Sequence, residues 1–251
     1  MDITTLLIAT LALAGGGIVK GATGAGAPII AVPILAMLYD VPFAVAVFTV
    51  PNFLSNIWQS WHLRGHRRAP RFTWGFALAG SAGAATGSLL LAHLPQETLM
   101  LGVAIAVFLY LGFRLRAPDW SIPFDRALPL APVAGFSGGV LQGAAGVSAP
   151  ISITFLNAIR LPKQEFIATI SVYFMAMSAV QIPLLSHLGI FTLERAVIGF
   201  VATGALLAAM PAGAARIGGG GGGGGGGEAR DAGAAAASDD ADADDAAEYA
   251  P

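Results

Sequence analysis

The chain has 251 residues, of which 55% are apolar and only 11% are charged. Soluble domains carry roughly 25% charged residues, so this composition excludes an ordinary soluble domain and is typical of a membrane protein. The sequence contains no cysteine, which excludes disulfide bonds, thiolate catalysis and cysteine-ligated metals. The net charge of −2 is uneven, because residues 1–216 carry twelve Lys and Arg against seven acids, and the remainder one Arg against eight acids.

The first element covers residues 3–39 and is interrupted by a glycine-rich stretch, Gly15 to Ile29. This stretch holds six glycines, a lysine and a proline. Gly costs about 1 kcal/mol and Pro about 3 kcal/mol relative to Ala inside a helix. The stretch therefore predicts a broken helix with two arms, 3–19 and 27–39, each short of the roughly 20 residues that span a bilayer.

The remaining elements alternate long apolar runs with polar loops. A basic loop at 62–71 and a second polar loop at 114–126 separate the groups. The expected spans cover residues 43–61, 72–93 and 97–113, followed by a second broken segment at 128–159 and spans at 165–186 and 191–215.

The second broken segment repeats the first at a distance of 122 residues. Gly138 to Ile151 aligns with Gly16 to Ile29, and eight of the fourteen positions are identical. The same shift pairs Gln59 with Gln181. Paired, glycine-interrupted hydrophobic segments in the two halves of a chain indicate the binding site of a transporter. We therefore expect an all-α polytopic membrane protein with two homologous helical repeats, about 3–116 and 126–216.

The basic loops predict the orientation of the repeats, since Lys and Arg gather on the cytoplasmic side. If each broken segment returns to the side it entered from, ten Lys and Arg lie inside and only Arg195 lies near an outer end. If each crosses once, the division is eight to three. The first count favours an inverted repeat.

The end of the chain differs from the rest. Residues 218–227 are ten consecutive glycines, and an Ala/Asp-rich segment follows. Such a segment buries too little apolar area to offset its ordering entropy. We expect a transmembrane domain over 1–216 and a disordered tail over 217–251.

The two breaks are candidate anion sites. Helices that restart at Ala27 and Ala149 present free amides and a positive dipole end, and the hydroxyls of Thr23 and Ser148 offer further donors. Pro28 and Pro150 suit the first turn of these helices. The alternative is that the glycines only let helices pack closely.

Lys20 is the sharpest single candidate for function. A charge inside a span costs about 2.5–3.5 kcal/mol on insertion scales and is a functional candidate by default. Its repeat partner Gln142 offers an uncharged hydrogen bond. The alternative is that Lys20 reaches toward the interface with its ammonium in water.

Polar residues on the spans after each break complete the candidate site. Asn52, Asn56 and Gln59 share one helix face, and Ser178 and Gln181 occupy the positions of Asn56 and Gln59 in the second copy. Hydrogen bonding between helices is the alternative. The full set of candidate solute-binding residues is Lys20, Gly21, Thr23, Gly24, Gly26, Pro28, Asn52, Asn56, Gln59, Gln142, Gly143, Gly146, Ser148, Pro150, Ser178 and Gln181.

The motif Gly-Ala-Thr-Gly-Ala-Gly-Ala-Pro at 21–28, its copy at 143–150 and the Arg-rich loop resemble the sulfite exporter TauE/SafE family over about residues 5–215. The resemblance implies an inner-membrane carrier of small anions, with sulfite, sulfonates and related sulfur compounds as substrates. Two features depart from the family pattern. Further glycines are common in the family where Ala25, Ala27, Val147 and Ser148 stand, and a final hydrophobic helix usually occupies the place of the glycine run.

Two other functions are weighed against transport. Gly135-Phe136-Ser137-Gly138 and Ser186-His187-Leu188-Gly189 resemble the serine and histidine motifs of rhomboid intramembrane proteases. A membrane assembly protein without transport activity is the third class. The histidines form no metal-ligand pattern and no ATP-binding motif is present, so we expect no catalytic residue, metal or cofactor. The expected partners are a small anionic solute and membrane lipid, with a possible homo-oligomer and no nucleic acid.

Overall fold

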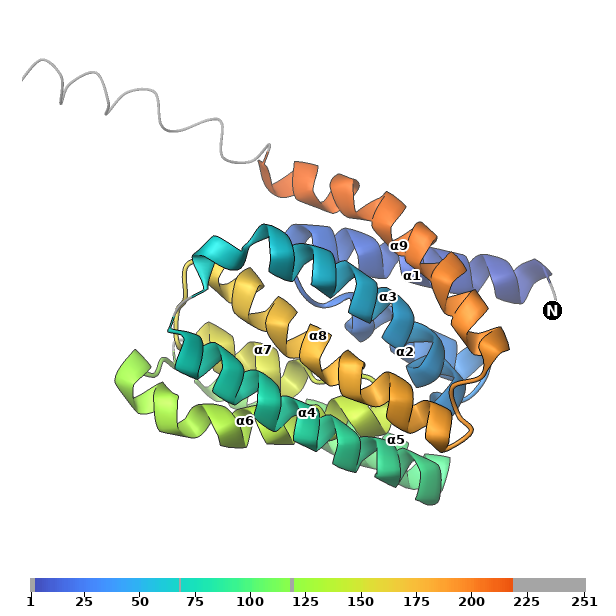
Figure 1. Cartoon of the computed structure of the whole chain (residues 1–251), viewed down its shortest axis with the longest axis horizontal. Helices are drawn as coiled ribbons and strands as arrows, with labels where there is room; N and C mark the ends of the chain where they lie inside the picture. Colours follow the sequence, from blue (N-terminus) through green and yellow to red (C-terminus); the bar gives the residue numbers. More distant parts are fainter. Residues whose placement is uncertain (1–2, 68, 118–119, 219–251) are drawn as a thin grey trace, which may run out of the picture. The chain divides into compact units, whose positions relative to one another are not determined.

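The computed structural model describes residues 3–67, 69–117 and 120–218, and these are helical almost throughout (Figure 1). Arg68 of the basic loop and the expected disordered tail beyond Gly218 lie outside the described residues. The chain divides into two units, residues 1–214 and 215–251. The domain boundary expected at 216/217 stays a prediction.

The first half of the described chain contains five α-helices and a short 3-10 turn. They are α1 (Ile3–Thr23), α2 (Ala27–Leu38), α3 (Val41–His62), η1 (Arg64–His66), α4 (Pro70–His93) and α5 (Gln96–Arg116). The second half contains α6 (Phe124–Ala145), α7 (Ala149–Ala158), α8 (Lys163–His187) and α9 (Leu193–Gly218). The expected order of helices and breaks is confirmed, and the first arm is longer than expected because α1 continues through Gly21 to Thr23. The span expected at 97–113 corresponds to α5, which is not among the membrane-spanning candidates of the described residues and stays a prediction.

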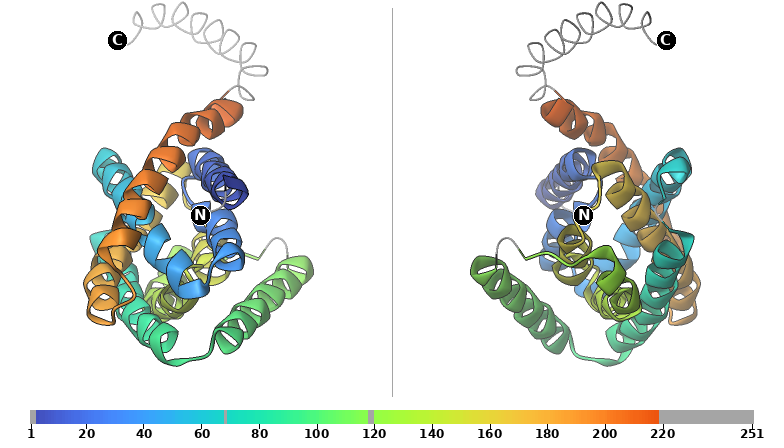
Figure 2. Two further views of the ribbon diagram at one scale, coloured as in Figure 1. Left: turned by 90° about the vertical axis from the view of Figure 1, so that its right-hand side faces the viewer. Right: turned by 90° about the vertical axis from the view of Figure 1, so that its left-hand side faces the viewer.

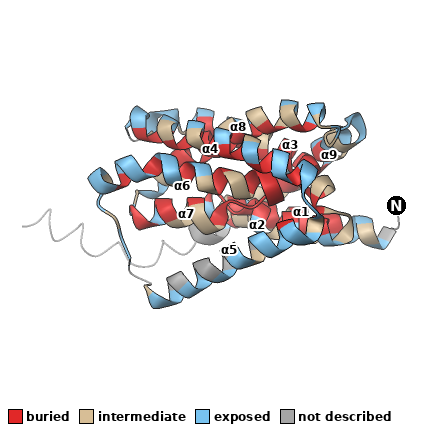
Figure 3. Cartoon of the chain, turned by 90° about the horizontal axis from the view of Figure 1, so that it is seen from below, coloured by how far each residue is buried: buried red, intermediate tan, exposed pale blue. Residues whose placement is uncertain are grey.

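Five of these helices are long and apolar enough to cross a membrane. They are Thr4–Thr23, Val41–His62, Pro70–His93, Lys163–His187 and Leu193–Ala215. Figure 3 shows buried residues on the inner faces of the helices and exposed residues on their outer faces. Many of the exposed residues are large and apolar, such as Leu11, Leu78 and Val201. The chain is therefore an all-α, multi-pass membrane protein.

Helix boundaries recur at the shift that the sequence repeat predicts. α2 begins at Ala27 and α7 at Ala149, and α3 begins at Val41 and α8 at Lys163, so each pair is 122 residues apart. α5 lies at the periphery of its unit (Figure 2), with Phe108 74% and Leu115 83% exposed. The same shift places the counterpart of Gln96 at Gly218, where the glycine run begins.

Two apolar clusters hold the helices together. One gathers small and branched side chains of α1, α2, α3 and α9 with the second break. The other is aromatic: the rings of Phe76 and Tyr173 stack with centroids 4.2 Å apart, and Phe72 and Phe155 extend the stack. The Tyr173 hydroxyl donates to the carbonyl of Gly135 at 3.0 Å, which ties α8 to α6 inside this cluster.

Candidate functional site

Both broken segments interrupt their helices at a glycine in the left-handed region of φ. After α1 ends, Gly24 has φ 77° and Gly26 has φ 94°, and after α6 ends Gly146 has φ 73°. Residues with a Cβ rarely adopt these angles, which explains why the helix stops at a glycine in each copy. α2 and α7 then restart at Ala27 and Ala149 with a proline in their first turn, as expected.

Each break packs against the long helix of the other half. A Cβ at Gly24 would lie 2.3 Å from Cγ1 of Ile167 on α8, and a Cβ at Gly146 would lie 3.4 Å from Cγ2 of Val45 on α3. Ile167 and Val45 are themselves 122 residues apart in the sequence. The two contacts involve equivalent positions of the repeat, and Val32 of α2 lies nearer still to Gly146, with its Cγ1 2.9 Å from an added Cβ. Each break therefore packs against residues of the opposite half.

Replacing Gly24 by Ala is expected to destabilise the protein by about 3 kcal/mol. A left-handed backbone costs a non-glycine residue about 1–2 kcal/mol, and overpacking adds about 1–3 kcal/mol. Gly189→Ala is the matched control, because Gly189 has φ 70° and no atom within 4 Å of an added Cβ. Unfolding in detergent should show a loss of only about 1 kcal/mol for the control. Equal losses in the two variants would mean that the contact with Ile167 contributes nothing.

Lys20 lies in the interior at one end of a hydrogen-bonded chain of polar side chains. Its side chain is 2% exposed, and its Nζ donates to Oδ1 of Asn56 at 3.0 Å. Nδ2 of Asn56 donates to Oδ1 of Asn52 at 2.9 Å, and Nδ2 of Asn52 donates to Oγ of Ser178 at 3.2 Å. The chain thus runs from α1 through α3 to α8 and joins the two halves. The ammonium is buried, so Lys20 does not reach out to water.

A cavity of about 480 Å³ borders the first broken segment, and Lys20, Asn52, Asn56 and Ser178 are not among its lining residues. It is lined by Gly21 and Gly24 of the first broken segment and by Gln59, one helical turn beyond Asn56. Oε1 of Gln59 also accepts from Oγ of Ser171 at 3.4 Å. The remaining lining is apolar and comes from Leu54 and Trp58 of α3, Ile167 of α8 and four residues of α9. This combination of apolar walls and few polar groups is typical of small-molecule sites.

Two candidate glutamines of the second half have buried amide atoms without a hydrogen-bond partner in the described part of the chain. Gln181 is fully buried, and neither of its amide atoms has a hydrogen-bond partner among the described residues. Oε1 of Gln142 is likewise buried without a partner there. Unsatisfied buried polar groups are costly, so such groups require an explanation.

The other candidates near the breaks have structural contacts. Thr23 is exposed, and its hydroxyl donates to the carbonyl of Val19 at 2.8 Å. Ser148 is buried and its Oγ accepts from Oγ of Ser152 at 3.1 Å. Pro28 is buried and Pro150 is half-buried.

Gly21 and Gly143 lie at close helix crossings. A Cβ at Gly21 would lie 1.9 Å from the carbonyl oxygen of Met210 on α9, and one at Gly143 2.2 Å from that of Ala84 on α4. These contacts favour the packing alternative for the two glycines. Their role in binding a solute stays a prediction, as does that of the other candidates.

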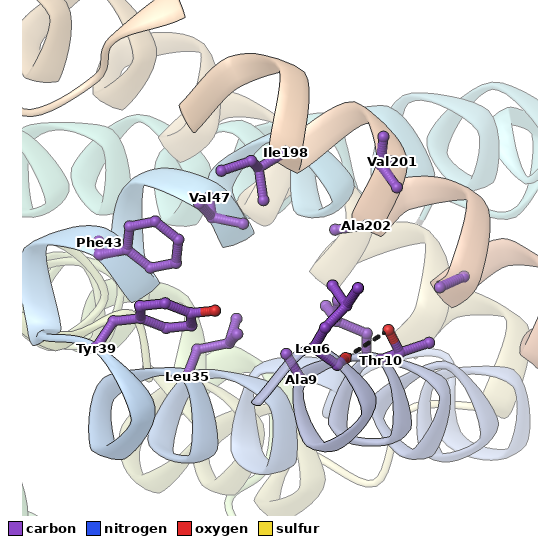
Figure 4. A pocket seen from close by; sticks show the side chains of 12 residues that line it. Leu6, Ala9, Thr10, Leu35, Tyr39, Phe43, Val47, Ile198, Val201 and Ala202 are labelled. Carbon is purple, nitrogen blue, oxygen red and sulfur yellow. Dashed lines mark hydrogen bonds between the residues drawn. The ribbon is translucent and has the colours of Figure 1, made fainter. Parts of the chain in front are cut away.

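Two further cavities have apolar linings. Figure 4 shows one of about 130 Å³, lined by side chains of α1, α2, α3 and α9 together with Tyr39. Its polar groups are the Tyr39 hydroxyl and Thr10, which donates to the carbonyl of Leu6 at 2.8 Å. The other, of about 230 Å³, borders the second break at Ala145 and Val147. Neither cavity has a charged residue in its lining, and the same is true of the 480 Å³ cavity.

The alternative chemistries find less support in this geometry. Ser137 is half-buried within α6, whereas His187 is exposed at the end of α8. No hydrogen bond joins the two within the described part of the chain. Over the same residues, no group of three or more His, Asp or Glu side chains is arranged to hold a metal.

Sequence reasoning missed Ser171, which hydrogen-bonds Gln59 across the two halves. Ser171 precedes Ser178 by seven residues, so both lie on one face of α8. That spacing is the signal by which Ser171 could have been found. Ser152 on α7 was also missed, because its role depends on its contact with Ser148.

Comparison with protein-family models matches residues 8–222 to the model described as sulfite exporter TauE/SafE. The search of curated proteins and the search of solved structures found no match.

Proposed function

This chain belongs to the sulfite exporter TauE/SafE family, and we propose that it carries sulfite, a sulfonate or a related sulfur anion across the inner membrane. The observation that supports this most directly is the buried ammonium of Lys20. It pairs with the neutral Asn56 rather than with a carboxylate. A buried cation without a counter-ion is costly, and an anionic solute supplies the missing charge.

The proposed binding site combines this ammonium with the ends of the two short helices. An ammonium has three N–H donors, and Asn56 takes one of them. At the start of α2 and α7, Pro28 and Pro150 have no N–H, and the amides of Ile29 and Ile151 donate to the carbonyls of Gly26 and Ser148 at 3.1 Å. Each helix end therefore offers the solute the amide of Ala27 or Ala149 and the positive end of its dipole. Neutral hydrogen-bonding groups complete the proposed site around the solute: Asn52, Gln59, Gln142, Ser178 and Gln181.

The proposed mechanism is alternating access around the paired breaks of an inverted repeat. The equal spacing of helix boundaries supports it, as do the equivalent contacts of Gly24 and Gly146 with the opposite half. Asn52 and Ser178 join the halves at the centre. A relative movement of the two halves then exposes the solute to one side at a time.

Uptake of labelled sulfite by proteoliposomes tests the function, with Asn56→Asp as the diagnostic variant. Asp at position 56 places a carboxylate against Lys20 and competes with the solute, so uptake should fall at least about tenfold. Asn157→Asp makes the same chemical change at an exposed position of α7 and should retain uptake.

Two outcomes contradict the proposal. Uptake of sulfite, thiosulfate, sulfonates and carboxylates no faster than in protein-free liposomes would exclude an anion carrier. Full uptake by a correctly folded Asn56→Asp variant would remove Lys20 and Asn56 from the binding site.

A further inference from the structure

Across the residues whose burial the structure describes, the interior holds a single charge, and it is positive. Lys20 is the one charged side chain that is buried among the residues whose burial the structure describes. The side chains joined to it by hydrogen bonds, directly or in series, are neutral: Asn56, Asn52 and Ser178. Asp40 is half-buried, and its carboxylate accepts from the backbone amide of Phe43 at the start of α3. It does not compensate Lys20.

The second half does not add another charge. Gln142 stands at the repeat position of Lys20, is 3% exposed, and lies on α6, which contacts both α3 and α8. Its side chain donates and accepts hydrogen bonds but carries no charge. The pair of repeat-related positions therefore offers one cation and one neutral amide.

One positive charge in an interior of low polarity balances one negative charge. A singly charged anion at Lys20 makes the occupied site neutral. A doubly charged anion leaves one negative charge uncompensated, and a buried unpaired charge is strongly unfavourable. The neutral amides stabilise the second charge far less than a second cation would.

We propose that the site selects singly charged anions over doubly charged ones, an inference that rests on the proposed function. For a sulfite-type solute the transported species is then the hydrogen sulfite anion. In this proposal, the positive charge of Lys20 compensates one negative charge of the solute. Gln142 is uncharged and therefore does not compensate a second one.

Competition between methanesulfonate and sulfate in proteoliposomes tests the inference. Both anions are tetrahedral at sulfur and present several oxygens, but at pH 7 the first carries one negative charge and the second carries two. Wild-type protein should transport methanesulfonate at least about tenfold faster than sulfate at equal concentration. Equal rates, or faster transport of sulfate, would overturn the inference and leave anion transport itself intact. Transport of neither anion would also overturn the inference, and the sulfite uptake assay decides the proposed function separately.

Gln142→Lys tests the role of the second position, and Gln142→Met is its uncharged control. The added cation should reduce the preference for methanesulfonate by about tenfold, whereas the Met variant should keep the preference of the wild type. An unchanged preference in a folded Gln142→Lys variant would remove Gln142 from the explanation. If that variant does not fold, the wild-type ratio decides the inference by itself.

Discussion

Replacing Lys20 by Gln is expected to lower anion affinity by about 10- to 100-fold, because a hydrogen bond to a charged group contributes about 1.5–3 kcal/mol. Folding should be retained. Lys20 is 2% exposed and has a neutral partner, and replacing a buried charge by a neutral group of similar size is often neutral or stabilising. Function and stability should therefore respond in opposite ways.

Anion-induced thermal stabilisation of purified protein measures this effect. Wild type should show a concentration-dependent rise in unfolding temperature with sulfite, and Lys20→Gln should require a much higher concentration. Lys163→Gln is the matched control, since it removes the other lysine of the chain at an exposed position of α8. The same sulfite response in Lys20→Gln as in wild type would place the anion elsewhere.

The second large effect is expected for Gly139→Leu, which should destabilise the protein by about 3 kcal/mol or more. A Cβ at Gly139 on α6 would lie 2.1 Å from the carbonyl oxygen of Gly80 on α4. Neither backbone can yield without separating the two helices, and overpacking of this kind costs about 1–3 kcal/mol, occasionally more. The reason is that small residues allow membrane helices to approach closely.

Gly75→Leu tests whether the position or the residue type causes this loss. Gly75 lies on α4 and has no atom within 4 Å of an added Cβ. Its replacement removes an unfavourable helix-interior glycine, so stability should stay the same or rise by up to about 1 kcal/mol. Denaturant unfolding of both variants in detergent gives the comparison. Equal destabilisation would show that the α4–α6 crossing is not the cause.

Much of the fold could be predicted from local features of the chain. The long apolar runs and the basic loops separate the helices, and the repeat of Gly24 and Pro28 at Gly146 and Pro150 marks both breaks. Within a membrane the backbone N–H and C=O groups must form hydrogen bonds inside the helix, so a helix is interrupted only where glycine or proline lies nearby in the sequence. The signals for a break are therefore local. The first break was nevertheless expected too early. Glycines 15–17 and Gly21 stay helical, and their use is packing rather than interruption.

Sequence patterns indicated that several candidate residues face inward but did not show their contacts, and solute binding by these residues stays a prediction. Burial of Lys20, Asn56 and Gln181 agrees with the expected inward face. The pairing of Asn52 with Ser178 and of Gln59 with Ser171 joins residues more than 100 positions apart. Sequence periodicity shows which residues share a face of one helix, but it does not show which helix lies opposite.

By itself the sequence determined the membrane class, the order of the helices, the duplication and the two glycine breaks, because each depends on residues that are neighbours along the chain or on one helix. Only the tertiary structure decided which glycines pack helices, where the ammonium of Lys20 lies, and that each break rests on the opposite half. Those features depend on distances between helices. Side chains from several segments that are distant in the sequence determine these distances together, so the distances cannot be inferred from any single stretch of the chain.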